Sequence, residues 1–358
     1  MAEKKRLLSL DVLRGITVAG MILVNNGAGP DIYAPLKHSA WNGLTPCDLV
    51  FPFFLFITGI STYISLRKFN FEASKSVIFK IIKRAVIIIL ICWGIDWFHH
   101  ICKGDFFPLE HLRLTGVLTR IGLCYGIVSL LAISIPHKHL LKIAAALLIL
   151  YSCILIYGNG YVLGENNIIS IIDKSILGSN HLYTKSPIDP EGLLGTLSAI
   201  AHTLIGFCFG ILLFRYKDVN EKVLQLLLAG FVLIAIGWLV SFGLPLNKRI
   251  WSPSYVLVTC GGAASLLAFL MYQIDVKGHE KWSRFFTVFG VNPLFLYVLS
   301  EILAIILSAF GLNDVAYHAI NSIISNTYLA SATYAVSFML LLGLAGYPLY
   351  RKEIYIKI

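Results

Sequence analysis

The stretch Ala85-Val-Ile-Ile-Ile-Leu-Ile-Cys-Trp93 decides the fold of this chain. It contains no charged residue, and its apolar side chains follow one another without the polar alternation of a membrane-spanning β-strand. Only helices and closed β-barrels satisfy all of their backbone hydrogen bonds within lipid. Because the stretch does not alternate, it predicts a transmembrane helix rather than a barrel strand.

The whole chain shares this apolar character. Of its 358 residues, 57% are hydrophobic and 13% are charged, and the mean hydropathy is +0.78. These values lie outside the range of an ordinary soluble domain. Since a bilayer-spanning helix needs about 20 apolar residues, we expect an all-α polytopic membrane protein with about ten transmembrane helices in one domain, residues 1–358. The expected helices lie near residues 8–26, 49–66, 77–98, 115–135, 140–157, 193–214, 223–243, 253–273, 285–309 and 332–350.

Basic residues are distributed unevenly between alternate connections. If the amino terminus is cytoplasmic, the cytoplasmic segments collect 17 Lys and Arg residues and the opposite side collects seven. Positive residues resist translocation, so both termini are predicted to be cytoplasmic. The basic residues of the cytoplasmic segments then face anionic membrane lipids, so the net charge of +10 requires no nucleic-acid partner. The longest outer connection, residues 158–192, is predicted to form a folded or re-entrant cap.

Basic side chains within the expected helices need partners, because an unpaired charge in lipid is costly. Arg14 follows Asp11 by three residues on one helical face, so it forms either a structural ion pair or a phosphate-binding group. Arg120 lies deeper in its helix and requires a carboxylate, carbonyl groups or a polar cavity. A further basic group, at the start of the third expected helix, faces either lipid phosphates or those of an anionic cofactor. Its members are Lys80, Lys83 and Arg84.

The most concentrated polar cluster lies between the first two expected helices. Asn25 ends the first helix, His38 lies in the connection, and Asp48 opens the second helix. An imidazole with a pKa of about 6.5 exchanges protons near neutrality, and a neighbouring carboxylate can orient its ring. A histidine in a loop is often merely solvated, but its place between two polar helix ends favours a catalytic role for His38 with Asp48, and Asn25 beside them is the third catalytic candidate. The same connection supplies two expected binding residues, Trp41 and Asn42.

Further charges lie at the ends of later helices on the same outer side. Asp189 and Glu191 precede the sixth expected helix, where they either cap the helix and favour its dipole or contribute to the site. Lys248 and Arg249 precede the eighth helix, as either interface anchors or binding groups. The polar residues of the ninth helix are Asn292 and Glu301.

The seven cysteines are scattered, mostly inside apolar runs, and show no Cys-x-x-Cys or Cys/His spacing. The sequence therefore predicts neither a metal site nor a disulfide framework.

Three motifs carry a resemblance to a known family. They are Ser9-Leu-Asp-Val-Leu-Arg-Gly15, His38-Ser-Ala-Trp-Asn-Gly-Leu-Thr-Pro-Cys-Asp-Leu-Val-Phe-Pro52 and Gly116-Val-Leu-Thr-Arg-Ile-Gly122. Weaker matches follow in order, including Asp189-Pro-Glu-Gly192 and Ser254-Tyr255. Over nearly its whole length, the chain resembles the transmembrane amino-sugar acetyltransferases, which include the lysosomal heparan-alpha-glucosaminide N-acetyltransferase and its bacterial relatives.

The resemblance implies an enzyme that moves acetyl from cytosolic acetyl-CoA to the amine of a glucosamine-type sugar across the membrane. It puts His38 at the position of the family's proposed active-site histidine and Asn25 at that of an asparagine beside it. A bacterial relative is expected in the inner membrane, with its active site near the periplasmic side. The residues expected to bind substrate or cofactor are Arg14, Trp41, Asn42, Arg120, Asp189, Glu191, Lys248, Ser254, Asn292 and Glu301.

Two departures from the lysosomal enzyme leave the acceptor open. Residues 158–188 lack the cysteines of its long loop, and Ser300 stands where it has a histidine. The sequence also leaves the oligomeric state open, including a homo-oligomer.

Several alternatives remain for the chemistry. His38 acts either as a base toward the acceptor's ammonium group or as an acetyl carrier through an acyl-imidazole. Either Asn25 or Asn292 is a candidate donor to the oxyanion. Two other functions stay open: a carrier for amino sugars or anions, and an O-acetyltransferase of an envelope polysaccharide.

Overall fold

The computed structural model describes residues 7–356. Four residues counted above as cytoplasmic charges lie outside this range, namely Lys4, Lys5, Arg6 and Lys357. The described part consists of helices and connecting loops without a strand, which confirms the predicted all-α class. The α-helices are α1 (Leu8–Asn25), α2 (Val50–Arg67), α3 (Lys75–Cys102), α4 (Val117–Ser134), α5 (Leu140–Tyr157), α6 (Ile168–Leu177), α7 (Thr196–Arg215), α8 (Val219–Ser241), α9 (Pro253–Met271), α10 (Arg284–Val291), α11 (Pro293–Ala309), α12 (Leu312–Ile323) and α13 (Thr327–Arg351).

Within residues 7–356, eight helices are long and apolar enough to cross a membrane, or nine if the bent pair α10–α11 forms one span. Helix α3 covers the predicted segment 77–98 but is not among these nine. The number and character of these helices make the chain a multi-pass membrane protein. The prediction of ten transmembrane helices and the prediction that both termini are cytoplasmic stay predictions.

The segment predicted as a single helix over residues 285–309 is broken. Its two halves, Lys281–Val291 and Pro293–Ala309, meet at 72°. Asn292 lies at the break, with φ −127° and ψ 59°. The reason is local, because a proline disfavours the α conformation in the residue before it and cannot donate a backbone hydrogen bond.

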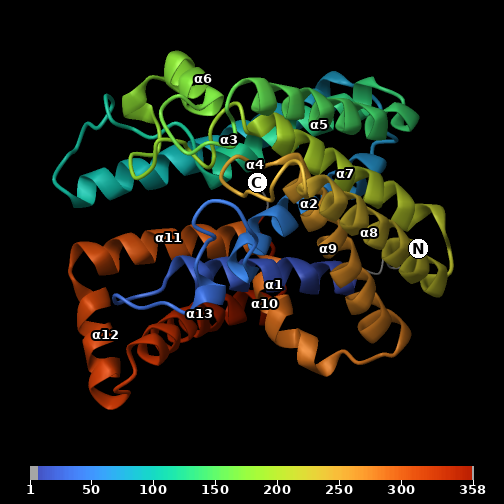
Figure 1. Ribbon diagram of the computed structural model, residues 1–358. Helices are drawn as coiled ribbons and strands as arrows, with labels where there is room; N and C mark the ends of the chain where they lie inside the picture. The colour runs from blue at the N-terminus through green and yellow to red at the C-terminus, as the bar shows by residue number, and fades with distance from the viewer. Residues whose placement is uncertain (1–6, 357–358) are drawn as a thin grey trace.

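Helix α1 is central to the bundle and packs against α2, α9, α10, α11 and α13 (Figure 1). Its approach to α10 is very close, because both helices present a glycine at the crossing. A Cβ atom added at Gly15 would lie 1.8 Å from the backbone oxygen of Phe286, and one at Gly290 would lie 1.9 Å from that of Asp11. The two backbones are therefore in direct contact.

Replacing Gly290 by alanine should destabilise the fold by about 1–3 kcal/mol, since the added methyl group forces α1 and α10 apart. The measurement is the thermal unfolding midpoint of the purified protein in detergent. Gly94→Ala is the matched control, because a Cβ at Gly94 of α3 meets nothing within 4 Å. Equal midpoints for the two variants would contradict the tight crossing.

The long connections gather at one end of the bundle, on the left of Figure 1. Hydrogen bonds join them: Gly43 to Leu246, Leu114 to His181, and the Trp41 indole to the Tyr161 carbonyl at 2.8 Å. The predicted cap, residues 158–192, lies here and contains α6. We call this the long-loop end. It contains the polar cluster predicted between the first two helices.

Candidate active site

Asp48 is fixed by the short turn that opens α2. The 3₁₀ turn Pro46–Leu49 begins with a capping box, in which Thr45 and Asp48 exchange hydrogen bonds. One carboxylate oxygen, Oδ2, accepts bonds from the Thr45 amide at 3.1 Å, the Thr45 hydroxyl at 3.0 Å and the Ser39 amide at 3.1 Å. Tyr255 of α9 also donates to the Asp48 backbone oxygen at 2.6 Å. The side chain is fully buried, and its other oxygen remains available.

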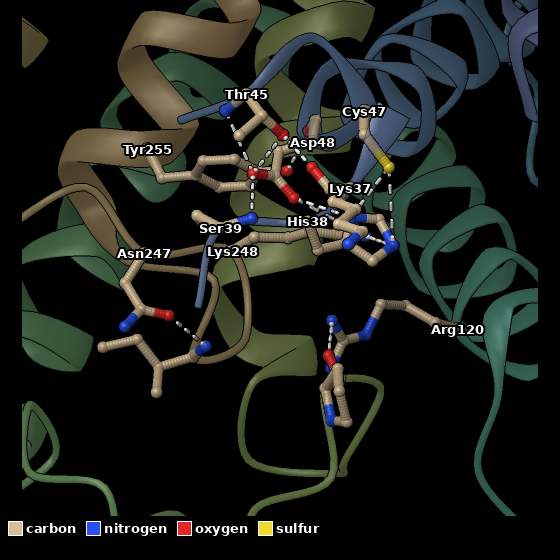
Figure 2. A network of polar contacts seen from close by, with 12 residues as sticks. Lys37, His38, Ser39, Thr45, Cys47, Asp48, Arg120, Asn247, Lys248 and Tyr255 are labelled. Carbon is tan, nitrogen blue, oxygen red and sulfur yellow. Dashed lines mark hydrogen bonds and ion pairs between the residues drawn. The ribbon is translucent and has the colours of Figure 1, made fainter. Parts of the chain in front are cut away.

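That oxygen, Oδ1, lies 2.7 Å from Nδ1 of His38 (Figure 2). An ionised carboxylate only accepts hydrogen bonds, so we assign the ring proton to Nδ1 and leave Nε2 as the acceptor. The His38 side chain is 46% exposed although its partner is buried. The predicted His38–Asp48 pair is thus formed: Asp48 holds the ring at Nδ1, and Nε2 is not engaged by the carboxylate.

Lys248 lies against the same ring. Its Nζ atom is 3.0 Å from each nitrogen of His38 and 4.0 Å from Asp48 Oδ1. Since Nδ1–H faces Asp48, the acceptor for the lysine is Nε2. The Lys248 side chain is only 12% exposed. Burial lowers the pKa of its ammonium group below the ordinary value, even though Glu191 and Asp48 oppose this change.

The loop before α9 holds Lys248 in place through its neighbour Asn247. The buried Asn247 amide accepts from the Ile250 backbone at 3.2 Å and donates to the Asn42 side chain at 3.2 Å. Asn42 is therefore tied to this loop rather than turned toward His38. Ser254, another expected binding residue, is fully buried and donates to the Pro245 carbonyl at 3.2 Å, so it supports the same loop.

A second ionic cluster borders His38. Arg113, in the loop between α3 and α4, bonds Asp189 at 2.7 Å and Glu191 at 2.9 Å. Burial alone would raise the pKa of Asp189, but the charge and hydrogen bond of Arg113, together with hydrogen bonds from Thr115 and the Glu191 amide, hold that pKa below the ordinary value. The guanidinium also lies 4.8 Å from the centre of the Tyr183 ring. Arg113 was not among the expected site residues, because its partners Asp189 and Glu191 lie 76 and 78 residues away in sequence.

Arg120 of α4 stabilises the segment that carries this cluster. It is 1% exposed and donates to the carbonyl oxygens of Pro190 at 2.8 Å and Gly192 at 2.9 Å. Of the three partners considered from sequence, the structure thus supplies carbonyl groups. Figure 2 shows Arg120 apart from His38, and the nearby Trp251 ring lies 5.1 Å from its guanidinium carbon.

A cavity of about 220 Å³ opens beside the His38 ring. Asn25 faces it from the end of α1, and its amide donates a long 3.4 Å bond to Glu301 of α11. Arg249, considered from sequence as an interface anchor or a binding group, also lines it, as does Tyr183, to which the sequence analysis gave no role. Of the expected site residues, those that line this cavity are Asn25, His38, Asp48, Glu191 and Lys248.

Cys47 lies 3.1 Å from Nδ1 of His38, a contact that the sequence did not suggest. The residue is 1% exposed and is not part of the cavity wall. It packs behind the ring and is not positioned to meet a ligand. Trp41 also points away, since its indole bonds the Tyr161 carbonyl in the cap.

A larger cavity of about 510 Å³ lies farther along the bundle and is lined by Arg14, Arg84 and Asn292. Arg14 bonds Asp11 at 2.8 Å and Ser61 at 3.0 Å, whereas Arg84 stacks on the Tyr125 ring at 4.9 Å. Asn292 lines this larger cavity and not the His38 cavity. Its amide instead holds the chain after α13, donating to Ile354 and accepting from Ile356, both at 2.8 Å.

Consecutive turns of the same helices line both cavities. In α2, Val50 and Phe51 face the His38 cavity, and Phe54 and Ile57 face the larger one. Helix α4 does the same with Val117 and Ile121, whereas α1 lines the larger cavity at Arg14 and the His38 cavity about two turns later at Met21. From Arg14 to Asn25 the axis of α1 rises about 16 Å. Across residues 7–356, no group of three or more His, Cys, Asp or Glu side chains is arranged to hold a metal ion.

Fold and site together define a multi-pass helical membrane protein with a His–Asp pair and a lysine at a cavity near one end of the bundle. Residues 6–182 match the family model described as heparan-alpha-glucosaminide N-acetyltransferase, catalytic. The chain is 31% identical to the heparan-alpha-glucosaminide N-acetyltransferase of Mus musculus over 84% of its own length and 54% of that relative. It is 30% identical to the Homo sapiens protein of the same name over 99% of its own length and 60% of that relative.

The chain belongs to the heparan-alpha-glucosaminide N-acetyltransferase family. It spans less than two thirds of the length of these two relatives. The family resemblance stated from the sequence motifs is confirmed.

Proposed function

We propose that this chain is a transmembrane N-acetyltransferase that transfers acetyl from cytosolic acetyl-CoA to the amine of a glucosamine-type sugar on the periplasmic side. The names of its relatives support the reaction class and the acceptor. The observation that carries the proposal is the His38 side chain, which is held at Nδ1 by Asp48 and lines a cavity with Nε2 beside the Lys248 amine. Such a pair is suited to removing a proton from an acceptor.

An amine attacks a thioester only in its neutral form, so the acceptor ammonium must first lose a proton. His38 Nε2 receives it, and Asp48 stabilises the resulting imidazolium through the 2.7 Å contact at Nδ1. An amine already lies at this position, because Lys248 Nζ is 3.0 Å from Nε2. The acceptor amine takes the same place when Lys248 moves aside.

Asn25 is the candidate donor to the developing oxyanion. Its 3.4 Å bond to Glu301 is at the long limit for a hydrogen bond, so the amide is weakly held and free to turn into the cavity. Asn292, the other candidate considered from sequence, lines the larger cavity and uses its amide to hold the chain after α13. The acceptor sugar's charge and hydroxyl groups would meet Glu191 and Arg249 in the cavity wall.

The larger cavity suits acetyl-CoA, because its wall carries the basic groups that the phosphates of this donor require. Arg84 lines this cavity and forms no ion pair within residues 7–356, while its ring contact with Tyr125 holds it there. Arg14 contributes a second guanidinium to the same wall. The shared helices α1, α2 and α4 then guide the thioester arm toward His38.

Replacing Arg84 by alanine should raise the KM for acetyl-CoA about tenfold, the effect of losing one charged hydrogen bond, with kcat nearly unchanged. Steady-state kinetics with varied acetyl-CoA measure this. Lys83→Ala is the matched control, since Lys83 is the preceding residue of α3 and does not line the cavity. A KM that rises equally in both variants would point to general loss of positive charge and contradict the assignment.

The central test uses purified protein in detergent with radiolabelled acetyl-CoA and glucosamine. N-acetylglucosamine should form without any membrane gradient. No product in detergent, together with uptake of unmodified sugar into proteoliposomes, would instead identify a carrier. Product formed only with hydroxyl acceptors that lack an amine would identify an O-acetyltransferase.

A further inference from the structure

We infer that Lys248 is itself an acetyl acceptor, so that the protein acetylates its own Lys248 side chain when donor is bound and no acceptor amine is present. This inference rests on the proposed acetyl transfer at His38. It assigns a modification site to a residue otherwise expected only to bind substrate.

The geometry of the cavity makes Lys248 the amine best placed for the reaction. Its Nζ atom is 3.0 Å from His38 Nε2, the position that the acceptor amine must occupy to lose its proton. Lys248 also lines the His38 cavity together with Asn25. Other lysines of the long-loop end, such as Lys37 and Lys185, are exposed and do not line this cavity.

The surroundings also favour the neutral, nucleophilic amine. Burial lowers the pKa of Lys248, and Arg249 adds to this effect. Glu191, Asp48 and Cys47 act in the opposite direction without reversing it. His38 is the remaining ionisable group in contact, and it accepts the proton that the ammonium releases.

The chemical step balances without an oxidant or reductant. The Nζ lone pair attacks the thioester carbonyl carbon, a C–N bond forms, and the C–S bond breaks. The nitrogen loses two protons in all: the one that the ammonium gives up to His38 before attack is released to water, and His38 passes the second, from the tetrahedral adduct, to the leaving thiolate. The products are a free thiol, N-acetyl-lysine and one proton. Because an amide is far more stable than a thioester, the modified lysine is a dead end rather than an intermediate of transfer.

Acetylation has a direct consequence for the site. It removes the positive charge 4.0 Å from Asp48 and leaves a neutral amide beside His38. The added group also takes up room in a cavity of about 220 Å³. The modified protein should therefore lose acceptor turnover, so that activity declines whenever donor is plentiful and acceptor is scarce.

The experiment incubates the full-length protein in detergent with radiolabelled acetyl-CoA alone. After treatment with hydroxylamine, which removes acetyl from cysteine and histidine but not from lysine, the peptides are analysed by mass spectrometry. Lys248 should carry the acetyl group at least about a hundredfold more often than Lys37 or Lys185, since only Lys248 lies 3.0 Å from the His38 nitrogen and a positioned general base contributes about 10²–10⁴-fold. Added glucosamine should suppress the labelling, and His38→Ala should abolish it.

Matched variants isolate the site. Lys248→Arg should abolish the label and Lys37→Arg should leave it unchanged, with equal unfolding midpoints confirming that both proteins are folded. Equal labelling of Lys37, Lys185 and Lys248 would show non-specific acetylation and overturn the inference. An unlabelled Lys248 in protein that still acetylates glucosamine would overturn it and leave the proposed function intact. If neither lysine nor glucosamine is acetylated, the proposed function itself fails.

Discussion

Replacing His38 by alanine should lower the rate of acetyl transfer by about 10²–10⁴-fold, the usual contribution of a positioned general base. The reason is that Nε2 of His38 is the proton acceptor at the cavity, and no other imidazole lines its wall within residues 7–356. The fold should tolerate the change, because the His38 side chain is 46% exposed. The measurement is initial-rate kinetics with acetyl-CoA and glucosamine.

His111→Ala provides the control, since His111 lies exposed in a loop of the same end of the bundle. It should retain the full rate. Binding of acetyl-CoA, followed separately by equilibrium binding, should persist in both variants. A His38→Ala protein with normal turnover would refute the assignment of the active site.

Replacing Asp48 by asparagine should reduce turnover by a similar factor, about 10²–10⁴-fold, because His38 then loses the anion that supports its protonated form. The carboxylate accepts bonds on both oxygens, from His38 Nδ1 on one side and from Thr45 and Ser39 on the other. An asparagine offers only one oxygen, so its NH₂ group must face a donor. The loss of a buried acceptor should also cost about 1–3 kcal/mol of stability.

Asp314→Asn, an exposed position in α12, is the matched control and should change neither rate nor unfolding midpoint. Measuring kcat and the unfolding midpoint on the same preparation separates the effect of Asp48→Asn on catalysis from its effect on stability. A midpoint that falls while kcat stays normal would assign Asp48 a structural role alone.

The helices were predictable because their signal is local. Every one of the ten expected segments overlaps a helix, and the pairing of His38 with Asp48 followed from their closeness to the same helix end. The break at Asn292 was missed because apolar composition continues through it, although Pro293 carried the relevant signal. Helix α12 lies outside the ten expected segments, because its 12 residues are too few to span lipid.

Long-range contacts within the site were beyond sequence reasoning. Lys248 contacts His38 across 210 residues, and Arg113 reaches Asp189 across 76. The sequence placed Lys248 and Asp189 at the outer surface, but only the packing of the connections shows which side chains meet. The contacts of Asn292 could not be predicted either. Its hydrogen-bond partners Ile354 and Ile356 are apolar residues that contribute backbone groups, and side-chain type gives no sign of such contacts.

The hydrogen bonds between the Asn292 side chain and the backbone after α13 have a consequence for biosynthesis. The wall of the larger cavity combines Arg14 of the first described helix with Ile356, which follows the last one. Since a chain is synthesised from its amino terminus, this wall cannot be completed until the ribosome has translated the segment after α13. A chain halted within α13 would still insert most of its helices into the membrane. Its larger cavity would lack part of the wall, and the Asn292 amide would lack its hydrogen-bond partners Ile354 and Ile356.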